Sequence, residues 1–173
     1  LPILFFVALT FQERGTEESF RSPKFFGLLL FGAYLIHQFE EHWIDLFGNE
    51  YAFQGSINSL VQSVLSSSPD QNGPLTAAAI FVINTSLVWL VAIIAIWQAP
   101  QRVFPTFALA SIVIINALVH ILGGVLTLSY NPGLLTSILV FVPLAMLAYL
   151  RIPARRAVLL LSIVWATLAH IIM

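Results

Sequence analysis

The sequence predicts an all-α fold, a polytopic bundle of transmembrane helices. Of its 173 residues, 59% are hydrophobic and only 9% are charged, whereas an ordinary soluble domain carries about 25% charged residues. Several apolar stretches also reach the length of about 20 residues that a helix needs to cross the hydrocarbon core of a bilayer. Because no linker or internal repeat divides the chain, we expect one membrane domain over residues 1–173.

The charge balance and the lack of cysteine exclude several classes of protein. The net charge is -1, so a nucleic-acid partner, which would require a basic surface, is not expected. The chain has no cysteine, which excludes a disulfide framework and a thiolate metal site. The high apolar content excludes an intrinsically disordered chain. The lipid bilayer is therefore the first expected partner.

Five apolar stretches are candidates for membrane-spanning helices, and turn residues separate them. Pro105 falls in the first turn of the third stretch, where a missing N–H costs nothing. Pro143 lies inside the fourth stretch and should kink it. A further apolar segment, residues 1–11, is too short to cross the bilayer and lacks the basic region and cleavage site of a signal peptide. The expected spans cover residues 25–47, 75–97, 104–128, 134–150 and 157–173.

The Lys and Arg side chains all fall on one side of the bilayer if each of the five stretches crosses it once. The positive-inside rule makes this side cytoplasmic. The opposite, non-cytoplasmic side then carries the one long loop, residues 48–74. The cations of the cytoplasmic side are Arg14, Arg21, Lys24, Arg102, Arg151, Arg155 and Arg156.

The loop of residues 48–74 contains apolar residues at helical spacing, with Ser and Gln between them. This pattern predicts an amphipathic helix of about three turns that lies in the membrane interface. Two interpretations fit it: a surface helix that shortens the loop, and a lid over a cavity that opens outward. The apolar positions are Ile57, Leu60, Val61, Val64 and Leu65.

Two adjacent glutamates lie inside the first expected span, between His37 and His42. A charged side chain at the centre of a spanning helix costs about 2.5–3.5 kcal/mol on insertion scales. Glu40 and Glu41 therefore have no inexpensive structural role. At about 100° per residue, they share one face of the helix with His37, whereas His42 points away from it. We expect a functional site on the shared face.

Four further polar residues lie within other expected spans, on three different helices. With a rise of about 1.5 Å per residue, all of them lie about 18–24 Å from the cytoplasmic ends of their spans, close to the depth of the first group. Polar groups at one depth on four helices are expected of a site inside a helical bundle. These further residues are Asn84, Asn116, His120 and His170.

Three motifs follow one another along the chain: HxxEE at residues 37–41, NxxxH at residues 116–120, and Tyr-Asn-Pro-Gly-Leu-Leu-Thr at residues 130–136. In this order they resemble the HXXEE-motif family of integral membrane proteins, whose function is uncharacterised. The resemblance implies that one set of residues acts together and implies no particular reaction. The set is His37, Glu40, Glu41, Asn116 and His120.

These residue types suit a metal centre, because imidazole and carboxylate groups bind zinc, iron and manganese. One glutamate would serve as a general base or bridge two metals, and Asn116 would orient a ligand or a water molecule. The leading hypothesis is a metal-dependent hydrolase or oxidoreductase that acts on a lipid or another apolar substrate. The candidate metal ligands are His37, Glu40, Glu41, His120 and His170, and the candidate catalytic residues are Glu40, Glu41 and Asn116.

Two other classes of function remain open. The chain suits a small accessory subunit of a larger membrane complex, in which a histidine such as His42 or His170 ligates haem or a chlorophyll-like pigment. The glutamate pair also suits a proton relay or an ion-coupled transporter, because two buried carboxylates cannot both ionise cheaply. A transporter is disfavoured by the small size of the chain and by the lack of inverted repeats.

Overall fold

The protein is described by a computed structural model, which covers residues 21–50, 52–65, 76–99 and 101–172. The predicted all-α fold is confirmed: within these ranges the chain forms helices, short connections and one isolated antiparallel bridge between Ile44 and Glu50. The predicted N-terminal apolar segment, residues 1–11, lies outside the described residues, as does Arg14.

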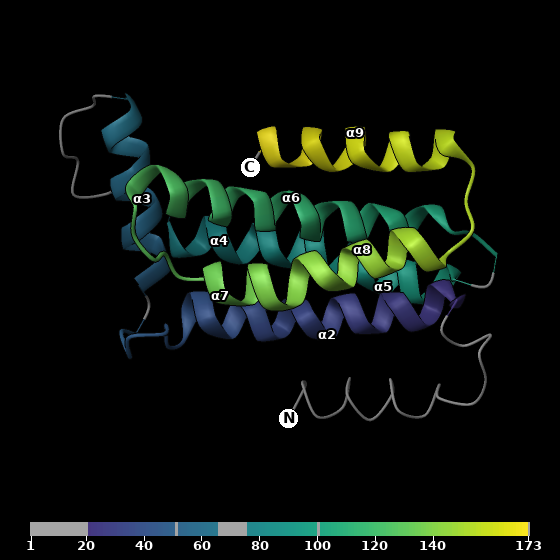
Figure 1. Cartoon of the computed structure of the whole chain (residues 1–173), viewed down its shortest axis with the longest axis horizontal. Coiled ribbons are helices and arrows are strands. Elements are labelled where there is room, and N and C mark those ends of the chain that lie inside the picture. Colours follow the sequence, from purple (N-terminus) through teal and green to yellow (C-terminus); the bar gives the residue numbers. More distant parts are fainter. Residues whose placement is uncertain (1–20, 51, 66–75, 100, 173) are drawn as a thin grey trace.

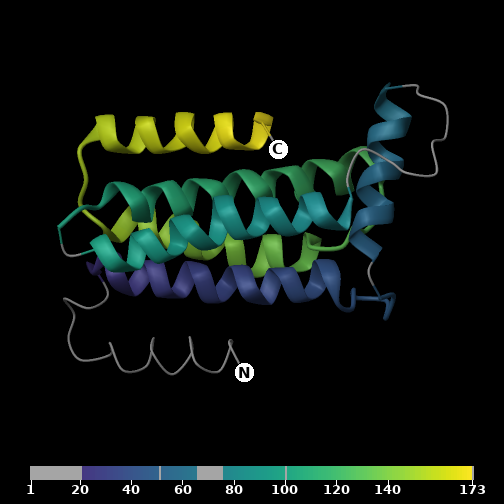
Figure 2. The ribbon, with the colours of Figure 1, turned by 180° about the vertical axis from the view of Figure 1, so that it is seen from behind.

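Most helices run back and forth along one axis, and α3 crosses them at one end (Figures 1 and 2). Two of the long helices contain a π-helical turn, labelled η. In chain order the elements are α2 (Pro23–His42), α3 (Ala52–Leu65), α4 (Ala77–Ile83), η2 (Asn84–Trp89), α5 (Leu90–Gln98), α6 (Phe104–Thr127), α7 (Leu134–Thr136), η3 (Ser137–Phe141), α8 (Val142–Arg151) and α9 (Arg156–Ile172).

Among the described residues, three continuous helical stretches are long and apolar enough to cross a membrane: Ala77–Gln98, Phe104–Thr127 and Leu134–Arg151. They correspond to the second, third and fourth expected spans. The first and fifth spans stay predictions. Helix α2 has 20 residues and includes two glutamates, and the apolar part of α9, Arg156–Ile171, is shorter than a full span.

Helix α2 ends at His42, earlier than the boundary of 47 expected from hydropathy. Asp45 organises a tight turn directly after it, because its Oδ1 atom accepts hydrogen bonds from the backbone N–H groups of Phe47 and Asn49 at 2.9 and 2.8 Å. Gly48 adopts the left-handed conformation that this turn needs, with φ +83°. Apolar residues therefore continue past the helix without extending it.

The described cations gather at one end of the bundle, where α2, α6 and α9 begin and α5 and α8 end (Figure 1). Helix α3 and the last turn of α2 lie at the opposite end. This arrangement agrees with the one-sided charge pattern of the sequence, while the cytoplasmic position of the basic end stays a prediction. The described cations are Arg21, Lys24, Arg102, Arg151, Arg155 and Arg156.

The central helix α6 packs against α2, α5, α8 and α9, and the buried core around it combines small side chains with large ones such as Phe107 and Leu109. Other large apolar residues point outward: Trp97, Leu126 and Leu150 are 77%, 76% and 74% exposed. Lipid tails can cover such side chains, so helix association in a bilayer relies on the close approach that small residues permit. The fully buried alanines are Ala92, Ala95, Ala110, Ala117, Ala145, Ala148 and Ala166.

Pro143 was expected to kink the fourth span, and the helix there changes its pitch. The π-helical turn η3 ends at Phe141, just before this proline. A proline ring clashes with the carbonyl group four residues earlier, which here belongs to Leu139 within η3. We attribute the wider π-helical turn to this clash.

Candidate metal centre

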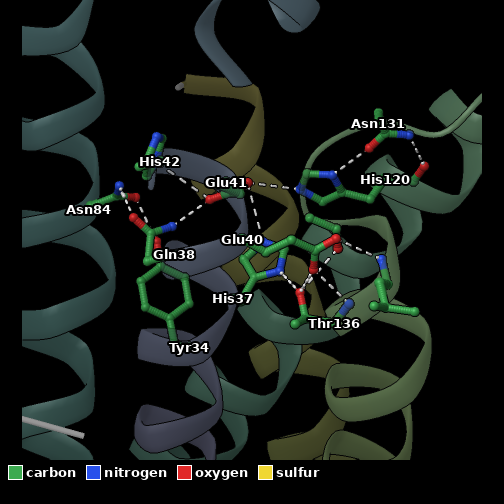
Figure 3. A network of polar contacts seen from close by, with 12 residues as sticks. Tyr34, His37, Gln38, Glu40, Glu41, His42, Asn84, His120, Asn131 and Thr136 are labelled. Carbon is green, nitrogen blue, oxygen red and sulfur yellow. Dashed lines mark hydrogen bonds and ion pairs between the residues drawn. The ribbon is translucent and has the colours of Figure 1, made fainter. Parts of the chain in front are cut away.

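A histidine and a glutamate from the last turns of α2 meet a histidine from α6 (Figure 3). His37 and Glu41 lie one helical turn apart and so share a face. The Glu41 Oε1 atom lies 3.2 Å from His37 Nε2 and 2.9 Å from His120 Nε2. The three residues are only 0%, 3% and 5% exposed. We call them the His–Glu–His cluster.

The ring proton of His37 is held on Nδ1, the nitrogen that faces away from the cluster. This atom lies 2.7 Å from Thr136 Oγ1, and the Thr136 hydroxyl donates to Glu40 Oε2 over 2.5 Å. A hydroxyl has one proton, so its oxygen accepts a hydrogen bond from His37 Nδ1. Neutral His37 therefore directs the lone pair of Nε2 at Glu41.

His120 is oriented in the same way by Asn131. The Asn131 side chain donates from Nδ2 to the backbone oxygen of His120 over 2.9 Å, which sets the orientation of the amide. Its Oδ1 atom then faces His120 Nδ1 at 2.8 Å. Because a carbonyl oxygen only accepts hydrogen bonds, Nδ1 of His120 carries the proton. Its Nε2 lies 2.9 Å from Glu41 Oε1 and, when the ring is neutral, directs a lone pair at that oxygen.

Both imidazoles thus direct a lone pair at one carboxylate oxygen, and His37 Nε2 has no hydrogen-bond donor. Three acceptors repel one another unless a second proton on one imidazole or a metal cation lies among them. Their ligand atoms lie within 4.8 Å of one another, and two imidazoles with one carboxylate form the donor set of catalytic zinc and non-haem iron sites. The cluster could therefore hold a metal ion, with Thr136 and Asn131 orienting its ligands.

A chain of amides and a phenol fixes the second oxygen of Glu41. Gln38 Nε2 donates to Glu41 Oε2 over 2.5 Å. Gln38 Oε1 in turn accepts from Asn84 Nδ2 at 2.6 Å, and Asn84 Oδ1 accepts from the Tyr34 hydroxyl at 2.6 Å. His42, which was expected to point away, approaches the same Oε2 atom at 3.5 Å. Only Oε1 of Glu41 is left for the cluster.

Glu40 points away from the cluster and anchors the start of the helix formed by α7, η3 and α8. Its oxygens accept hydrogen bonds from the backbone N–H groups of Leu135 and Thr136 at 3.1 and 2.8 Å. They also accept from the Tyr130 hydroxyl at 2.8 Å. Burial raises the pKa of Tyr130, so its hydroxyl stays a donor at neutral pH. A carboxylate at a helix N-terminus is also favoured by the helix dipole.

Gly133 lets the two histidine rings approach each other. A Cβ atom at this position would lie 2.6 Å from Cε1 of His120 and 2.8 Å from Cε1 of His37. Its φ of +95° is also in the left-handed region. A residue with a side chain would therefore be strained in its backbone and would separate the rings.

A cavity of about 670 Å³ lies beside the cluster. It is bounded by α3, by the second half of α6, by the loop before α7 and by the end of α9, and His120 forms part of its wall. Asn116 and His170 also line it. Phe53 of α3 packs against both His120 and His42, with ring centroids 6.0 and 5.2 Å apart.

The structure brings together three of the five candidate metal ligands, His37, Glu41 and His120. Glu40 and His170 lie outside this group: Glu40 binds the start of α7, and His170 Nδ1 lies 2.9 Å from the backbone oxygen of Ala166. Asn116, a candidate catalytic residue, contributes to the cavity wall near His120.

Sequence reasoning did not assign roles to the residues that hold the cluster in place. The run at residues 130–136 was interpreted only as a tight turn and a family motif, yet it supplies four of them. The density of Tyr, Asn, Gly and Thr in one turn was the available signal. The residues missed are Gln38, Tyr130, Asn131, Gly133 and Thr136.

Comparison with known families agrees with the motifs in this site. A family model described as a protein of unknown function with HXXEE motif matches residues 28–148. The chain belongs to the HXXEE-motif family. The matched region includes the whole His–Glu–His cluster and its supporting turn but not His170. Neither the curated proteins nor the solved structures gave a match.

Proposed function

We propose that the His–Glu–His cluster binds one divalent metal ion and that the protein is a membrane-embedded, metal-dependent enzyme. The observation that carries the proposal is the orientation of both imidazoles, whose Nε2 lone pairs point at one oxygen of Glu41. Hydrogen bonds from Nδ1 to Thr136 and Asn131 support this orientation. The three ligands leave coordination positions free for a water molecule or a substrate.

A bound divalent ion would supply Lewis-acid chemistry, polarising a substrate oxygen and making water more acidic. The residues of this chain would hold and orient it. His37 and His120 would bind through Nε2, and Glu41 through Oε1. Glu40, through Thr136, would keep the proton of His37 on Nδ1. The donor set suits zinc-dependent hydrolysis and iron-dependent oxidation, so the metal identity decides the reaction class.

We propose a lipid or another apolar molecule as the substrate, because the cavity beside His120 lies among apolar helices. By the positive-inside rule, the basic end faces the cytoplasm and the cluster lies toward the opposite side. Helix α3 then covers the cavity from outside, as its Phe53 contact with His120 suggests.

The decisive experiment is metal analysis of the purified protein and of two matched histidine variants. We expect about one zinc, iron or manganese ion per chain in the wild type, loss of the ion in His120→Gln, and retention in His170→Gln. Glu41→Gln should also lose the ion, since it removes the only charged ligand. Equal metal content in the two histidine variants, or no metal in the wild type after reloading, would refute the proposal.

A proton relay is the second candidate, and one observation favours it. His42 Nε2 is buried without a hydrogen-bond partner, 3.5 Å from the Glu41 oxygen opposite the cluster. A relay would pass protons across Glu41 without a metal. Proton flux through metal-free protein in liposomes, abolished by Glu41→Gln, would favour it. An accessory subunit that ligates haem or a chlorophyll-like pigment would instead show visible absorption bands after purification.

A further inference from the structure

Two residues on the wall of the cavity beside the metal centre each carry a buried polar atom that no group in the described part of the chain satisfies. Asn116 Oδ1, on α6, and His170 Nε2, on α9, are buried without a hydrogen-bond partner. Both residues line the same cavity. An unpaired buried polar group costs about 1–3 kcal/mol, so two of them on the walls of one cavity point to a ligand that supplies the missing partners.

Both unpaired atoms are hydrogen-bond acceptors. His170 Nδ1 lies 2.9 Å from the backbone oxygen of Ala166. Because that oxygen only accepts, Nδ1 carries the ring proton, and Nε2 of the neutral ring has a free lone pair. The Asn116 atom is an amide carbonyl oxygen, which also accepts. The ligand must therefore donate hydrogen bonds from two places.

The charge of the cavity restricts the ligand further. Its described lining contains no Asp, Glu, Lys or Arg side chain. An ammonium head group would lack a carboxylate partner, and a phosphate head group would lack the Lys or Arg that usually binds it. Neutral hydrogen-bond donors, such as hydroxyl groups, are left. Phe53, Ile57 and Val119 give the same cavity an apolar wall for a hydrocarbon chain.

We infer that the cavity binds a neutral lipid with at least two hydroxyl groups. Asn116 Oδ1 and His170 Nε2 accept hydrogen bonds from these hydroxyls and hold the lipid head beside His120. The two residues thus determine which lipid the enzyme selects. This inference rests on the proposed function, because it names the class of substrate that reaches the metal centre.

The test compares two probes that differ only in their hydrogen-bond donors, monooleoylglycerol and its dimethyl ether. Binding of each radiolabelled lipid is measured on the full chain in phosphatidylcholine nanodiscs. Two hydrogen bonds correspond to roughly tenfold tighter binding of monooleoylglycerol in the wild type. Equal affinity for the two probes would overturn the inference.

Matched variants assign the preference to the two residues. Asn116→Leu and His170→Leu should each reduce the preference, and the double variant should bind both probes equally. His170→Gln keeps an acceptor and should retain part of the preference, which separates the lost hydrogen bond from a disturbed fold. Ser162→Ala, a buried serine outside the cavity, should leave the preference unchanged. A double variant that folds and keeps the tenfold preference contradicts the inference.

Metal content measured on the same samples separates this inference from the proposed function. If every variant binds metal and no probe preference exists, only the choice of substrate is wrong. If the preference exists in a protein that binds no metal, the cavity selects hydroxylated lipids but the proposed enzyme is wrong.

Discussion

Two clusters of buried polar side chains lie in opposite halves of the bundle, and their hydrogen bonding differs. In the basic half, Ser111, Tyr149 and Ser162 join three helices, with Ser111 Oγ 2.5 Å from the Tyr149 hydroxyl and 3.1 Å from Ser162 Oγ. The two serines also donate to backbone oxygens of their own helices, at 2.7 Å each. Every hydroxyl proton of this serine–tyrosine cluster therefore has an acceptor.

The His–Glu–His cluster has the opposite ratio of donors to acceptors. When both imidazoles are neutral, their Nε2 atoms and the facing Glu41 oxygen are all hydrogen-bond acceptors. The Nδ1 protons of His37 and His120 form hydrogen bonds with Thr136 and Asn131, outside the cluster. The two Nε2 atoms face Glu41 directly, with no other described side chain between them. A closed set of hydrogen bonds serves helix packing. An acceptor-rich set is stable only when a cation completes it, and this distinction separates a structural cluster from a candidate site.

The largest effect that we expect comes from Gly133→Ala. The new Cβ would press on both histidine rings, and overpacking of this kind costs about 1–3 kcal/mol in addition to about 1–2 kcal/mol for a left-handed backbone. Gly48→Ala is the matched control, since Gly48 also has a positive φ but has no neighbour within 4 Å of a Cβ. Thermal unfolding in detergent should show the larger loss of stability in Gly133→Ala. Equal losses would mean that the rings are not closely packed.

Metal removal should destabilise the protein through the His–Glu–His cluster alone. At a free metal concentration of 100 times Kd, binding stabilises the folded state by about 2.7 kcal/mol. A chelator should therefore lower Tm in the wild type and in Ser111→Ala, which alters only the serine–tyrosine cluster. Glu41→Gln should show no response. A chelator response in Glu41→Gln would place the metal elsewhere.

A smaller effect is expected when the support of His37 is removed. Thr136→Val keeps the shape of the side chain but loses the hydroxyl between Glu40 and His37. Loss of such an outer contact reduces metal affinity by about 10–100-fold, measurable by competition with a chelator of known affinity. Thr106→Val, which removes a 3.3 Å hydrogen bond to Pro23 at the basic end, should leave metal affinity unchanged. Similar changes of metal affinity in both variants would contradict the role of Thr136 in linking Glu40 to His37.

The smallest effect concerns the turn after α2. Hydrogen bonds from the Asn49 side chain and from the backbone of residues 47–49 hold the pKa of Asp45 below its usual value. A lowered pKa gives stability that is present above the unfolded pKa of about 3.9 and is lost as the pH falls through the folded pKa. The Tm difference between wild type and Asp45→Asn should therefore be constant above about pH 5 and shrink as the pH falls below about 4. A constant difference would show that the carboxylate charge does not matter.

The sequence was sufficient for the fold class and for part of the candidate site. Hydropathy identified the long apolar helices, and the helical period placed His37, Glu40 and Glu41 on one face. The helical period could not decide whether Glu40 or Glu41 contacts His120, because both glutamates lie on the same face of α2. That choice depends on the turn at Gly133, which brings the start of α7 against Glu40 and leaves Glu41 for the histidines.

The other features that the sequence did not predict depend mostly on contacts between segments that are far apart in the chain. Thr136 lies 99 residues from the histidine that it orients, and no local pattern relates the two. The end of α2 at His42 was missed because Trp43, Ile44, Leu46 and Phe47 continue the apolar pattern after it. The turn is instead set by Asp45, whose side chain binds the backbone N–H groups that follow.

The two π-helical turns have a consequence for how this site could arise and be lost. A π-helical turn contains one residue more than an α-helical turn, so it changes the register of the residues before it relative to those after it. Asn84 begins η2, and Thr136 directly precedes η3. Deletion of one residue from η3 would rotate Thr136 by about 100° relative to α8 and withdraw it from both Glu40 and His37. An uninterrupted α-helix at this point would therefore lack the register that places Thr136 beside Glu40 and His37.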